Sequence, residues 1–263
     1  MTPTADHGED SYRGSEKLKD YSVLITGADS GIGRAVALAC AREGANVAFA
    51  YLEEDQDAAE TVRWIEQAER QAIKVRGDIQ NVDFCHRLVQ QTYEQFGRLD
   101  VLINNAAYQM AQPELGDFSV EQIERTFRTN ILAMFYLCQA AVPLMKPGAS
   151  IINTASIQAY QPSPELLDYA ATKAAIVNFT KGLAKLVSDQ GIRVNAVAPG
   201  PVWTPLIPST MPAEKVENFG DNTVFGRPAQ PAELAPLYIW LASREASYVT
   251  GEVVGATGGR SPF

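Results

Sequence analysis

Short apolar runs alternate with longer amphipathic segments along most of the chain. The runs are apolar on both faces, which is typical of strands buried in a parallel sheet, and they occupy residues 21–26, 46–51, 72–76, 99–104, 150–154, 192–197 and 249–255. Helix-like segments lie between them, at residues 32–42, 55–71, 82–96, 120–145 and 166–189. We therefore predict an α/β fold, a doubly wound parallel β-sheet with helices on both faces, in a single domain.

Two stretches depart from this alternation. Residues 1–19 are polar and lack periodicity, which predicts a flexible leader or an arm over the surface, so that the domain proper spans residues 20–263. From about residue 200 to 230 prolines interrupt the pattern. A long connection after a strand's carboxyl end is usually functional, so we interpret it as a lid or specificity loop.

Composition narrows the functional classes. The net charge of -9 argues against a nucleic-acid partner, and no apolar run reaches the roughly 20 residues that span a bilayer. The odd set of Cys40, Cys85 and Cys138 and the absence of a secretory signal favour a reducing, cytoplasmic location. Only His7 and His86 are histidines, and we expect both at the surface. A Ser-His-Asp hydrolase is therefore disfavoured, and we expect no metal site.

A glycine-rich turn separates the first strand from the first helix. Its glycines permit close backbone approach to a pyrophosphate, and the helix N-terminus that follows offers N–H groups and partial positive charge. Position between a strand and a helix is the context that distinguishes a dinucleotide site from an ordinary turn. The candidate cofactor residues in this turn are Gly27, Asp29, Ser30, Gly31, Ile32 and Gly33.

The second candidate site is a tyrosine and a lysine four residues apart. Tyr169 and Lys173 share one face of the predicted helix 166–189, which brings a phenol beside an ammonium group. A nearby positive charge lowers the pKa of a phenol and makes it a better acid–base group near neutral pH. Ser156, thirteen residues upstream, could hydrogen-bond the same substrate oxygen.

Six motifs together resemble one known family. Residues 26–33 (TGADSGIG), Asn104-Asn105-Ala106, Asn130, Ser156, Tyr169-x-x-x-Lys173 and Pro199-Gly200 occur in the order and spacing of the short-chain dehydrogenase/reductase family, over about residues 18–259. The segments at 51–54, 105–109, 127–130 and 203–208 are closer to its glucose/ribitol dehydrogenase-like, general-stress branch. Ala107 replaces a common glycine, and that branch shares the alanine. The resemblance implies a Rossmann-like fold.

The resemblance also implies a mechanism. Tyr169 would be the general acid in carbonyl reduction and the base in alcohol oxidation. Lys173 would lower the pKa of that tyrosine and bind the nicotinamide ribose. Ser156 would hold the substrate oxygen, and Asn130 would position a water that links Lys173 to solvent. The reaction would move hydride between a nicotinamide and a small-molecule alcohol or carbonyl.

Further cofactor contacts follow from the same resemblance. Asp78 would contact the adenine, Asn104 and Ala106 the ribose side, and Pro199 and Gly200 the nicotinamide. The expected contacts are completed by Tyr51, Leu52, Ile79, Asn105, Ala107, Tyr169, Lys173, Val202 and Thr204. An acidic residue that ends the second strand selects NAD(H), but Tyr51 stands there, and Arg34 could reach a 2′-phosphate. We therefore favour NADP(H), with NAD(H) as the alternative.

Two kinds of side chain bear on the substrate, and one helix bears on the assembly. Gln158 and Gln109 could bind polyol hydroxyls, whereas Trp203 and Met110 would suit an apolar ketone. The predicted helix 120–145 is apolar around much of its circumference, and the resemblance implies a homotetramer built on it and on the helix after Tyr169. The rival functions are a 3-oxoacyl carrier-protein reductase, which the acidic charge disfavours, and a non-catalytic nicotinamide sensor.

Overall fold

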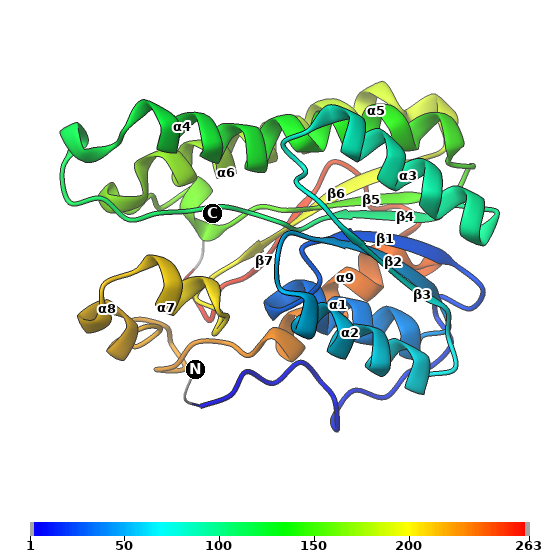
Figure 1. Cartoon of the computed structure of the whole chain (residues 1–263), viewed down its shortest axis with the longest axis horizontal. Coiled ribbons are helices and arrows are strands. Elements are labelled where there is room, and N and C mark those ends of the chain that lie inside the picture. Colours follow the sequence, from blue (N-terminus) through cyan, green and yellow to red (C-terminus); the bar gives the residue numbers. More distant parts are fainter. Residues whose placement is uncertain (1–2, 261–263) are drawn as a thin grey trace.

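The computed structural model of the chain, described for residues 3–260, is built on one seven-stranded sheet. All neighbouring strands pair in parallel, in the order β3-β2-β1-β4-β5-β6-β7 (Figure 1). The strands are β1 (Ser22–Thr26), β2 (Asn46–Tyr51), β3 (Ala72–Arg76), β4 (Val101–Asn104), β5 (Ser150–Thr154), β6 (Arg193–Pro199) and β7 (Val253–Ala256). The predicted parallel α/β fold is thereby confirmed.

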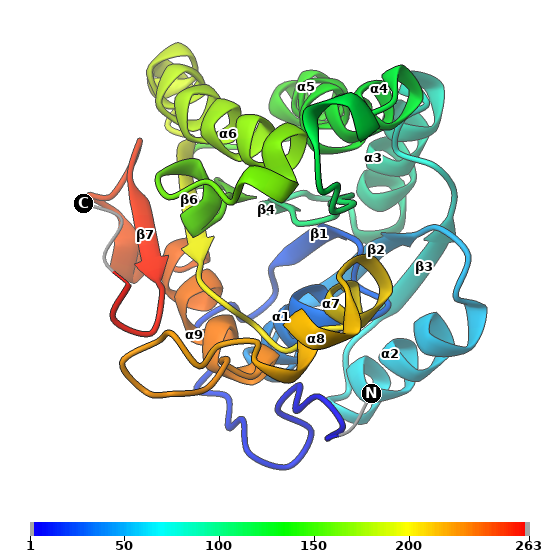
Figure 2. The same cartoon turned by 90° about the vertical axis from the view of Figure 1, so that its left-hand side faces the viewer.

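Helices cover both faces of the sheet. The helices are α1 (Gly31–Arg42), α2 (Asp55–Gln67), α3 (Val82–Phe96), α4 (Val120–Phe127), α5 (Ala133–Ala141), α6 (Leu167–Leu186), α7 (Leu206–Thr210), α8 (Ala213–Glu217) and α9 (Pro231–Ala242). Figure 2 shows α1, α2 and α9 on one face and α3, α4, α5 and α6 on the other. The short helices α7 and α8 lie beyond the carboxyl edge of the strands.

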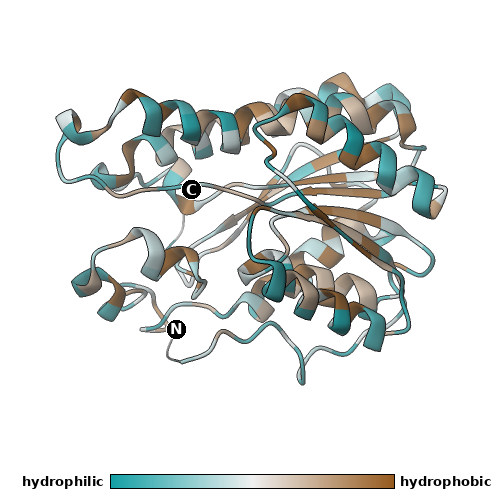
Figure 3. Ribbon diagram, viewed as in Figure 1, coloured by the Kyte–Doolittle hydropathy of each residue, from teal (hydrophilic) through white to brown (hydrophobic). Residues whose placement is uncertain are grey.

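Burial explains why the central strands are apolar on both faces. Val23, Leu24 and Ile25 of β1 are all fully buried; Val23 and Ile25 pack into one core and Leu24 into the other. Figure 3 shows the same arrangement, with apolar colour concentrated on the sheet and on the inner sides of the helices. The sheet therefore separates two hydrophobic cores, and its carboxyl edge carries the polar loops.

The predicted long helix 120–145 is wrong in one respect. The chain is helical there, but the π-helix Arg128–Leu132 separates α4 from α5, and the 3₁₀ helix Val142–Leu144 follows α5. A π-helix places one extra residue in a turn and often marks a functional site. Here the extra turn contains Asn130.

Two other expectations need correction. Helix α9 was not predicted, although Pro231 at its first position is a favourable start and the helix is buried against α1. His7 is also not a surface residue, because only 7% of it is exposed, whereas His86 is exposed as expected. The segment around His7 packs against α1 and α9 rather than extending from the domain.

Candidate functional site: a cleft at the carboxyl edge of the sheet

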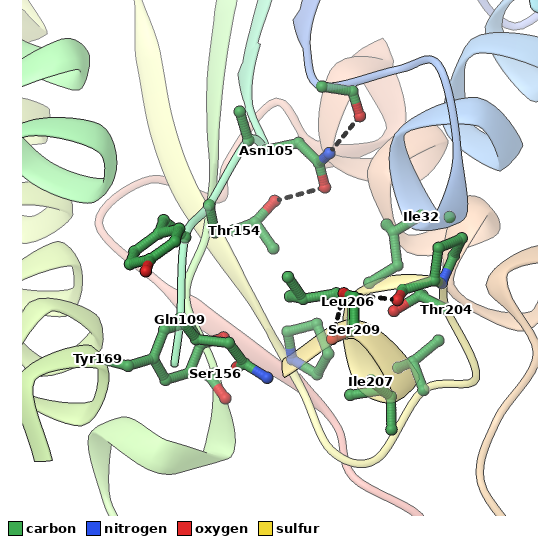
Figure 4. A pocket seen from close by; sticks show the side chains of 18 of the residues that line it. Ile32, Asn105, Gln109, Thr154, Ser156, Tyr169, Thr204, Leu206, Ile207 and Ser209 are labelled. Atoms are coloured by element: carbon green, nitrogen blue, oxygen red, sulfur yellow. Dashed lines mark hydrogen bonds between the residues drawn. The ribbon is translucent and has the colours of Figure 1, made fainter. Parts of the chain in front are cut away.

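A large cleft of about 940 Å³ runs along the carboxyl edge of the sheet. One end is formed by the turn after β1 and by the end of β2, and the other by the loops after β4 and β5 together with α7 and α8. Figure 4 shows how side chains from these distant segments converge on it. Ligands of open α/β sheets bind at such an edge.

The turn after β1 presents the N-terminus of α1 to this cleft. Ser30 is the N-cap residue, yet its side chain accepts no hydrogen bond from the helix. The first N–H groups of a helix have no partner within the helix, so these groups are available to an anion in the cleft. Gly27 and Gly31 have φ angles of 66° and 53°, and a Cβ atom at Gly33 would lie 2.0 Å from the carbonyl oxygen of Gly27. Only glycine fits this turn, and the geometry suits a pyrophosphate.

Asn105 holds the turn against the next loop. Its Nδ2 donates to the carbonyl oxygens of Gly27 at 3.0 Å and Thr26 at 3.2 Å, and its Oδ1 accepts from Thr154 Oγ1 at 3.4 Å (Figure 4). The expectation that Asn104 lines the cleft is wrong. That side chain is buried behind the edge, where its Nδ2 donates to Asn153 Oδ1 at 2.9 Å.

Ser156, Tyr169 and Lys173 meet in the middle of the cleft. Tyr169 and Lys173 come from the first half of α6, and Ser156 follows β5 as the N-cap of the 3₁₀ helix Ile157–Ala159. The Ser156 hydroxyl is close enough to the Tyr169 hydroxyl to affect its pKa, and Lys173 Nζ lies 5.1 Å from the centre of the tyrosine ring. Lys173 Nζ donates to the carbonyl oxygen of Thr154 at 2.7 Å. An ammonium group has three donors, so two remain for a ligand.

The pKa values at this cluster differ from the expectation that Lys173 lowers the pKa of Tyr169. Burial raises the pKa of the Tyr169 phenol to about 12, and the nearby Ser156 hydroxyl lowers it by less. Burial also lowers the pKa of Lys173 to about 7, from an ordinary value of 10.5. Loss of hydration disfavours both charged forms, and this effect outweighs the attraction between them. Proximity to Lys173 therefore does not by itself make Tyr169 acidic.

Asn130 lies behind the cleft rather than in it. Its Nδ2 donates to the carbonyl oxygen of Tyr108 at 2.9 Å and to Thr172 Oγ1 at 3.0 Å, and its Oδ1 accepts from Tyr108 N at 2.8 Å. The side chain thus ties the loop after β4 to α6, one residue before Lys173. Its amide is already occupied by protein groups.

The end of the cleft at β2 is acidic. Tyr51 and Leu52 line it as expected, and so do Glu53, Glu54 and Asp57. The expectation that Arg34 could reach a phosphate here is wrong. Its guanidinium is 6% exposed and forms ion pairs with Asp57 and Glu60, at 3.4 and 2.9 Å.

The other end of the cleft, near α7 and α8, contains two of the expected substrate residues, Gln109 and Gln158. Gln109 Nε2 donates to Thr210 Oγ1 at 2.9 Å, and Gln158 Nε2 donates to Ser163 Oγ at 2.9 Å, so both glutamines are held by protein partners. Trp203 does not line the cleft. Its indole N–H instead donates to the carbonyl oxygen of Pro3 at 2.8 Å, on the outer side of the segment.

The structure gathers nearly all the predicted site residues around one cleft. Of the predicted catalytic and cofactor residues, those that do not line it are Gly33, Arg34, Asn104 and Asn130. Sequence reasoning missed Thr154, whose carbonyl oxygen holds Lys173, and Asp168, whose buried carboxylate accepts from Thr126 Oγ1 at 2.7 Å. The position of Asp168 directly before Tyr169 was a usable signal.

Residues 3–260 contain neither a metal-binding cluster nor a membrane-spanning helix. No group of three or more histidine, cysteine, aspartate or glutamate side chains in this range is arranged to hold a metal ion. Within the same range, no helix combines the length and the apolar character that crossing a membrane requires.

Comparisons with known proteins agree with this site. The family model described as Enoyl-(Acyl carrier protein) reductase matches residues 27–261. General stress protein 39 of Bacillus subtilis (strain 168) is 47% identical over 98% of this chain and 91% of its own length. The glucose and ribitol dehydrogenase of Daucus carota is 45% identical, again over 98% of this chain and 91% of its own length.

A solved structure extends the comparison to three dimensions. The short chain dehydrogenase from Burkholderia cenocepacia J2315, in complex with NADP, superposes with a TM-score of 0.87 at 30% identity, over 92% of this chain and 98% of that one. With the fold, the cleft and the motif residues in agreement, the chain belongs to the short-chain dehydrogenase/reductase family of oxidoreductases, near the general-stress and glucose/ribitol dehydrogenase relatives.

Proposed function

We propose that the protein transfers hydride between NADP(H) and a secondary alcohol or a carbonyl compound, with Ser156, Tyr169 and Lys173 as its acid–base group. The observation that carries this proposal is the position of the three side chains. They meet in one cleft with the uncapped N-terminus of α1, so a dinucleotide held at the helix could extend to the tyrosine.

Each of the three residues has a distinct task. A bound nicotinamide supplies or accepts the hydride. The Tyr169 hydroxyl gives its proton to the carbonyl oxygen during reduction, and the Tyr169 phenolate removes the proton from the alcohol during oxidation. Ser156 donates a hydrogen bond to the same oxygen. Lys173, held by the carbonyl oxygen of Thr154, directs its remaining N–H groups to the ribose hydroxyls.

The perturbed pKa values suit this division of work. A phenol with a pKa of about 12 is fully protonated at neutral pH, as carbonyl reduction requires, and a lysine with a pKa of about 7 changes charge near neutral pH. Protonation of Lys173 brings a positive charge to the tyrosine and favours the phenolate that alcohol oxidation needs. We therefore propose that Lys173 sets the direction in which the tyrosine works best. Asn130 would support this pair through the loop it holds.

For the nucleotide we propose NADP(H), with NAD(H) as the alternative. Tyr51 at the end of β2 leaves the ribose 2′ position without the carboxylate that selects NAD(H), and the Burkholderia structure was solved with NADP. The neighbouring Glu53, Glu54 and Asp57 oppose a 2′-phosphate by charge. Titration of the purified protein with each reduced nucleotide decides between them, and tighter binding of NADH would reject the proposed preference.

For the substrate we propose a sugar or polyol as the first class to assay, because the Daucus carota relative is named for glucose and ribitol. Trp203 lies outside the cleft, which weakens the argument for an apolar ketone as substrate. Turnover of simple ketones without turnover of sugars or polyols would overturn this choice.

We also propose that the chain forms a homotetramer through α4, α5 and α6. Apolar side chains of these helices and of the π-helix between α4 and α5 are exposed on the monomer, namely Val120, Ile123, Phe127, Leu132, Phe135 and Leu167. Light scattering during size-exclusion chromatography measures the mass, and a monomer would contradict the proposal. The three buried free cysteines support a reducing, cytoplasmic location.

The direct test of the function is Tyr169→Phe. The variant keeps the ring and loses the hydroxyl, so kcat/KM should fall by at least about 100-fold while nucleotide still binds. The exposed Tyr248 offers a matched control, because Tyr248→Phe removes a hydroxyl far from the cleft. Unchanged turnover in Tyr169→Phe would refute the assigned role.

A further inference from the structure

The N-terminal arm, residues 3–19, is anchored at the C-terminal end of α1. The Arg42 guanidinium donates to three arm carbonyl oxygens, those of Gly8 at 2.6 Å, Tyr12 at 2.8 Å and Glu9. The next side chain, Glu43, is 2% exposed and accepts from the Tyr12 hydroxyl at 2.7 Å and from two backbone N–H groups of the arm. Charge-assisted hydrogen bonds of this kind are among the stronger ones in proteins. The arm is therefore an integral part of the domain.

The beginning of the arm is held by different elements. Asp6 N donates to Gln230 Oε1 at 3.0 Å, and the carbonyl oxygen of Asp6 accepts from Ala232 N at 3.0 Å, in the first turn of α9. Pro3 then offers its carbonyl oxygen to the indole of Trp203. Figure 1 shows the arm passing beneath α1 and α9 toward the segment that carries α7 and α8.

Trp203 lies between two residues of the cleft wall without lining the cleft itself. Val202 and Thr204 face the cleft, and a Cβ atom at Gly31 would lie 3.2 Å from the Cβ of Thr204. The segment 202–204 therefore covers the phosphate turn from one side. On its other side the Trp203 indole is bonded to the arm, and its backbone N–H donates to Ala229 O at 2.8 Å.

No described arm residue lines the cleft. Any effect of the arm on nucleotide binding must therefore be indirect, through the residues that the arm contacts. Among these, Trp203 is directly next in sequence to two residues of the cleft wall, Val202 and Thr204. A hydrogen bond to the buried indole of Trp203 restricts both the ring and the backbone that carries it. Without this bond the segment 202–204 would sample more positions before a nucleotide orders it, and ordering costs binding free energy.

We propose that Trp203 is a positioning residue for the nicotinamide nucleotide, and that the arm, through the carbonyl oxygen of Pro3, holds the segment 202–204 in its nucleotide-covering position. The inference rests on the proposed function, because it assumes that the cleft binds NADP(H). It adds a role for an N-terminal segment whose described residues do not themselves line the cleft.

The test compares Trp203→Phe, which keeps an aromatic ring and loses the N–H donor, with removal of residues 2–6, which takes away Pro3. The dissociation constants of NADPH and NADH are measured by isothermal titration calorimetry. Each change should raise the dissociation constant of the preferred nucleotide about fivefold, the usual contribution of one hydrogen bond. The two changes combined should have no more effect than the deletion, because both break the same contact.

Trp240→Phe is the matched control, since Trp240 is a half-buried tryptophan of α9 that lines no part of the cleft. In Trp203→Phe, kcat at saturating nucleotide and the substrate KM should stay at the wild-type values. A general loss of structure would instead lower kcat and thermal stability together. Unchanged nucleotide affinity in Trp203→Phe overturns the inference. If the wild-type protein binds neither nucleotide, the proposed function itself has failed.

Discussion

Replacing Lys173 with methionine should stabilise the protein at neutral pH while it abolishes turnover. Lys173 is 2% exposed, and burial lowers its pKa from 10.5 to about 7. In the unfolded chain the lysine regains its ordinary pKa, so between these two values the unfolded state binds more protons than the folded state. Stability then rises with pH across this window and is lowest below pH 7. Methionine has a similar length and no proton to lose.

The size of the effect follows from the pKa difference. Each pKa unit corresponds to about 1.4 kcal/mol, so the buried lysine costs about 4 kcal/mol of folding free energy at pH 7. At pH 9 only about 1.5 units of the difference remain, and the cost falls to about 2 kcal/mol. The variant also loses the hydrogen bond to Thr154 O, which costs about 1–3 kcal/mol at either pH. The change between the two pH values, about 2 kcal/mol, is therefore independent of that bond.

Urea unfolding without nucleotide, at pH 7 and at pH 9, measures this difference. The free energy of unfolding of the variant, relative to wild type, should be about 2 kcal/mol higher at pH 7 than at pH 9, because all other titrating groups are common to both proteins. Lys185→Met, at an exposed position of the same helix, is the control and should show the same stability difference at both pH values. An equal stability difference for Lys173→Met at the two pH values would refute the argument that burial controls this lysine.

Three further predictions concern the cleft. Ser156→Ala should lower kcat/KM by about 100-fold and shift the rise of the alcohol-oxidation rate with pH to higher pH, because the Ser156 hydroxyl lowers the pKa of Tyr169; a pH–rate profile that keeps its wild-type rise would contradict this. Leu52→Arg should tighten NADP binding about fivefold and leave NAD binding unchanged, because it adds a cation to the acidic end of the cleft at β2. Calorimetry measures both affinities, and equal changes for the two nucleotides would show that residue 52 does not face the 2′ position. Gly33→Ala should abolish nucleotide binding in the same assay, since its Cβ would overlap the carbonyl oxygen of Gly27, and a variant that binds normally would show that the turn is not the phosphate site.

The fold was largely predictable because its strands are apolar on both faces. A run such as residues 22–26 has no polar side and fits only a covered parallel sheet. Helix α9 was missed for a physical reason: it has two prolines, Pro231 and Pro236, and its apolar residues surround it because it is buried against α1 and β5. Sequence periodicity identifies helices with one exposed face, and this helix has little exposed surface.

The residues of the site were easier to predict than their partners. Glycine spacing and the Tyr169–Lys173 pair were visible in the sequence, and these residues do meet at the cleft. The partners of Arg34 were not visible, because Asp57 and Glu60 come from α2 and only the folded chain brings them to α1. The pKa of Tyr169 was misjudged for a related reason. Spacing along a helix reports the nearby charge but not how deeply both groups are buried.

The π-helix Arg128–Leu132 sets the rotation of α4 relative to α5. Each residue of an α-helix turns the chain by about 100°, so the extra residue of this turn changes which side of α4 faces α6 relative to α5. Deleting one residue here would let an unbroken α-helix form and would rotate Thr126 and Gln122 away from the buried carboxylate of Asp168, which both now contact. Shortening this turn by one residue would therefore cost α6 its hydrogen bonds from α4 at Asp168, the residue directly before Tyr169.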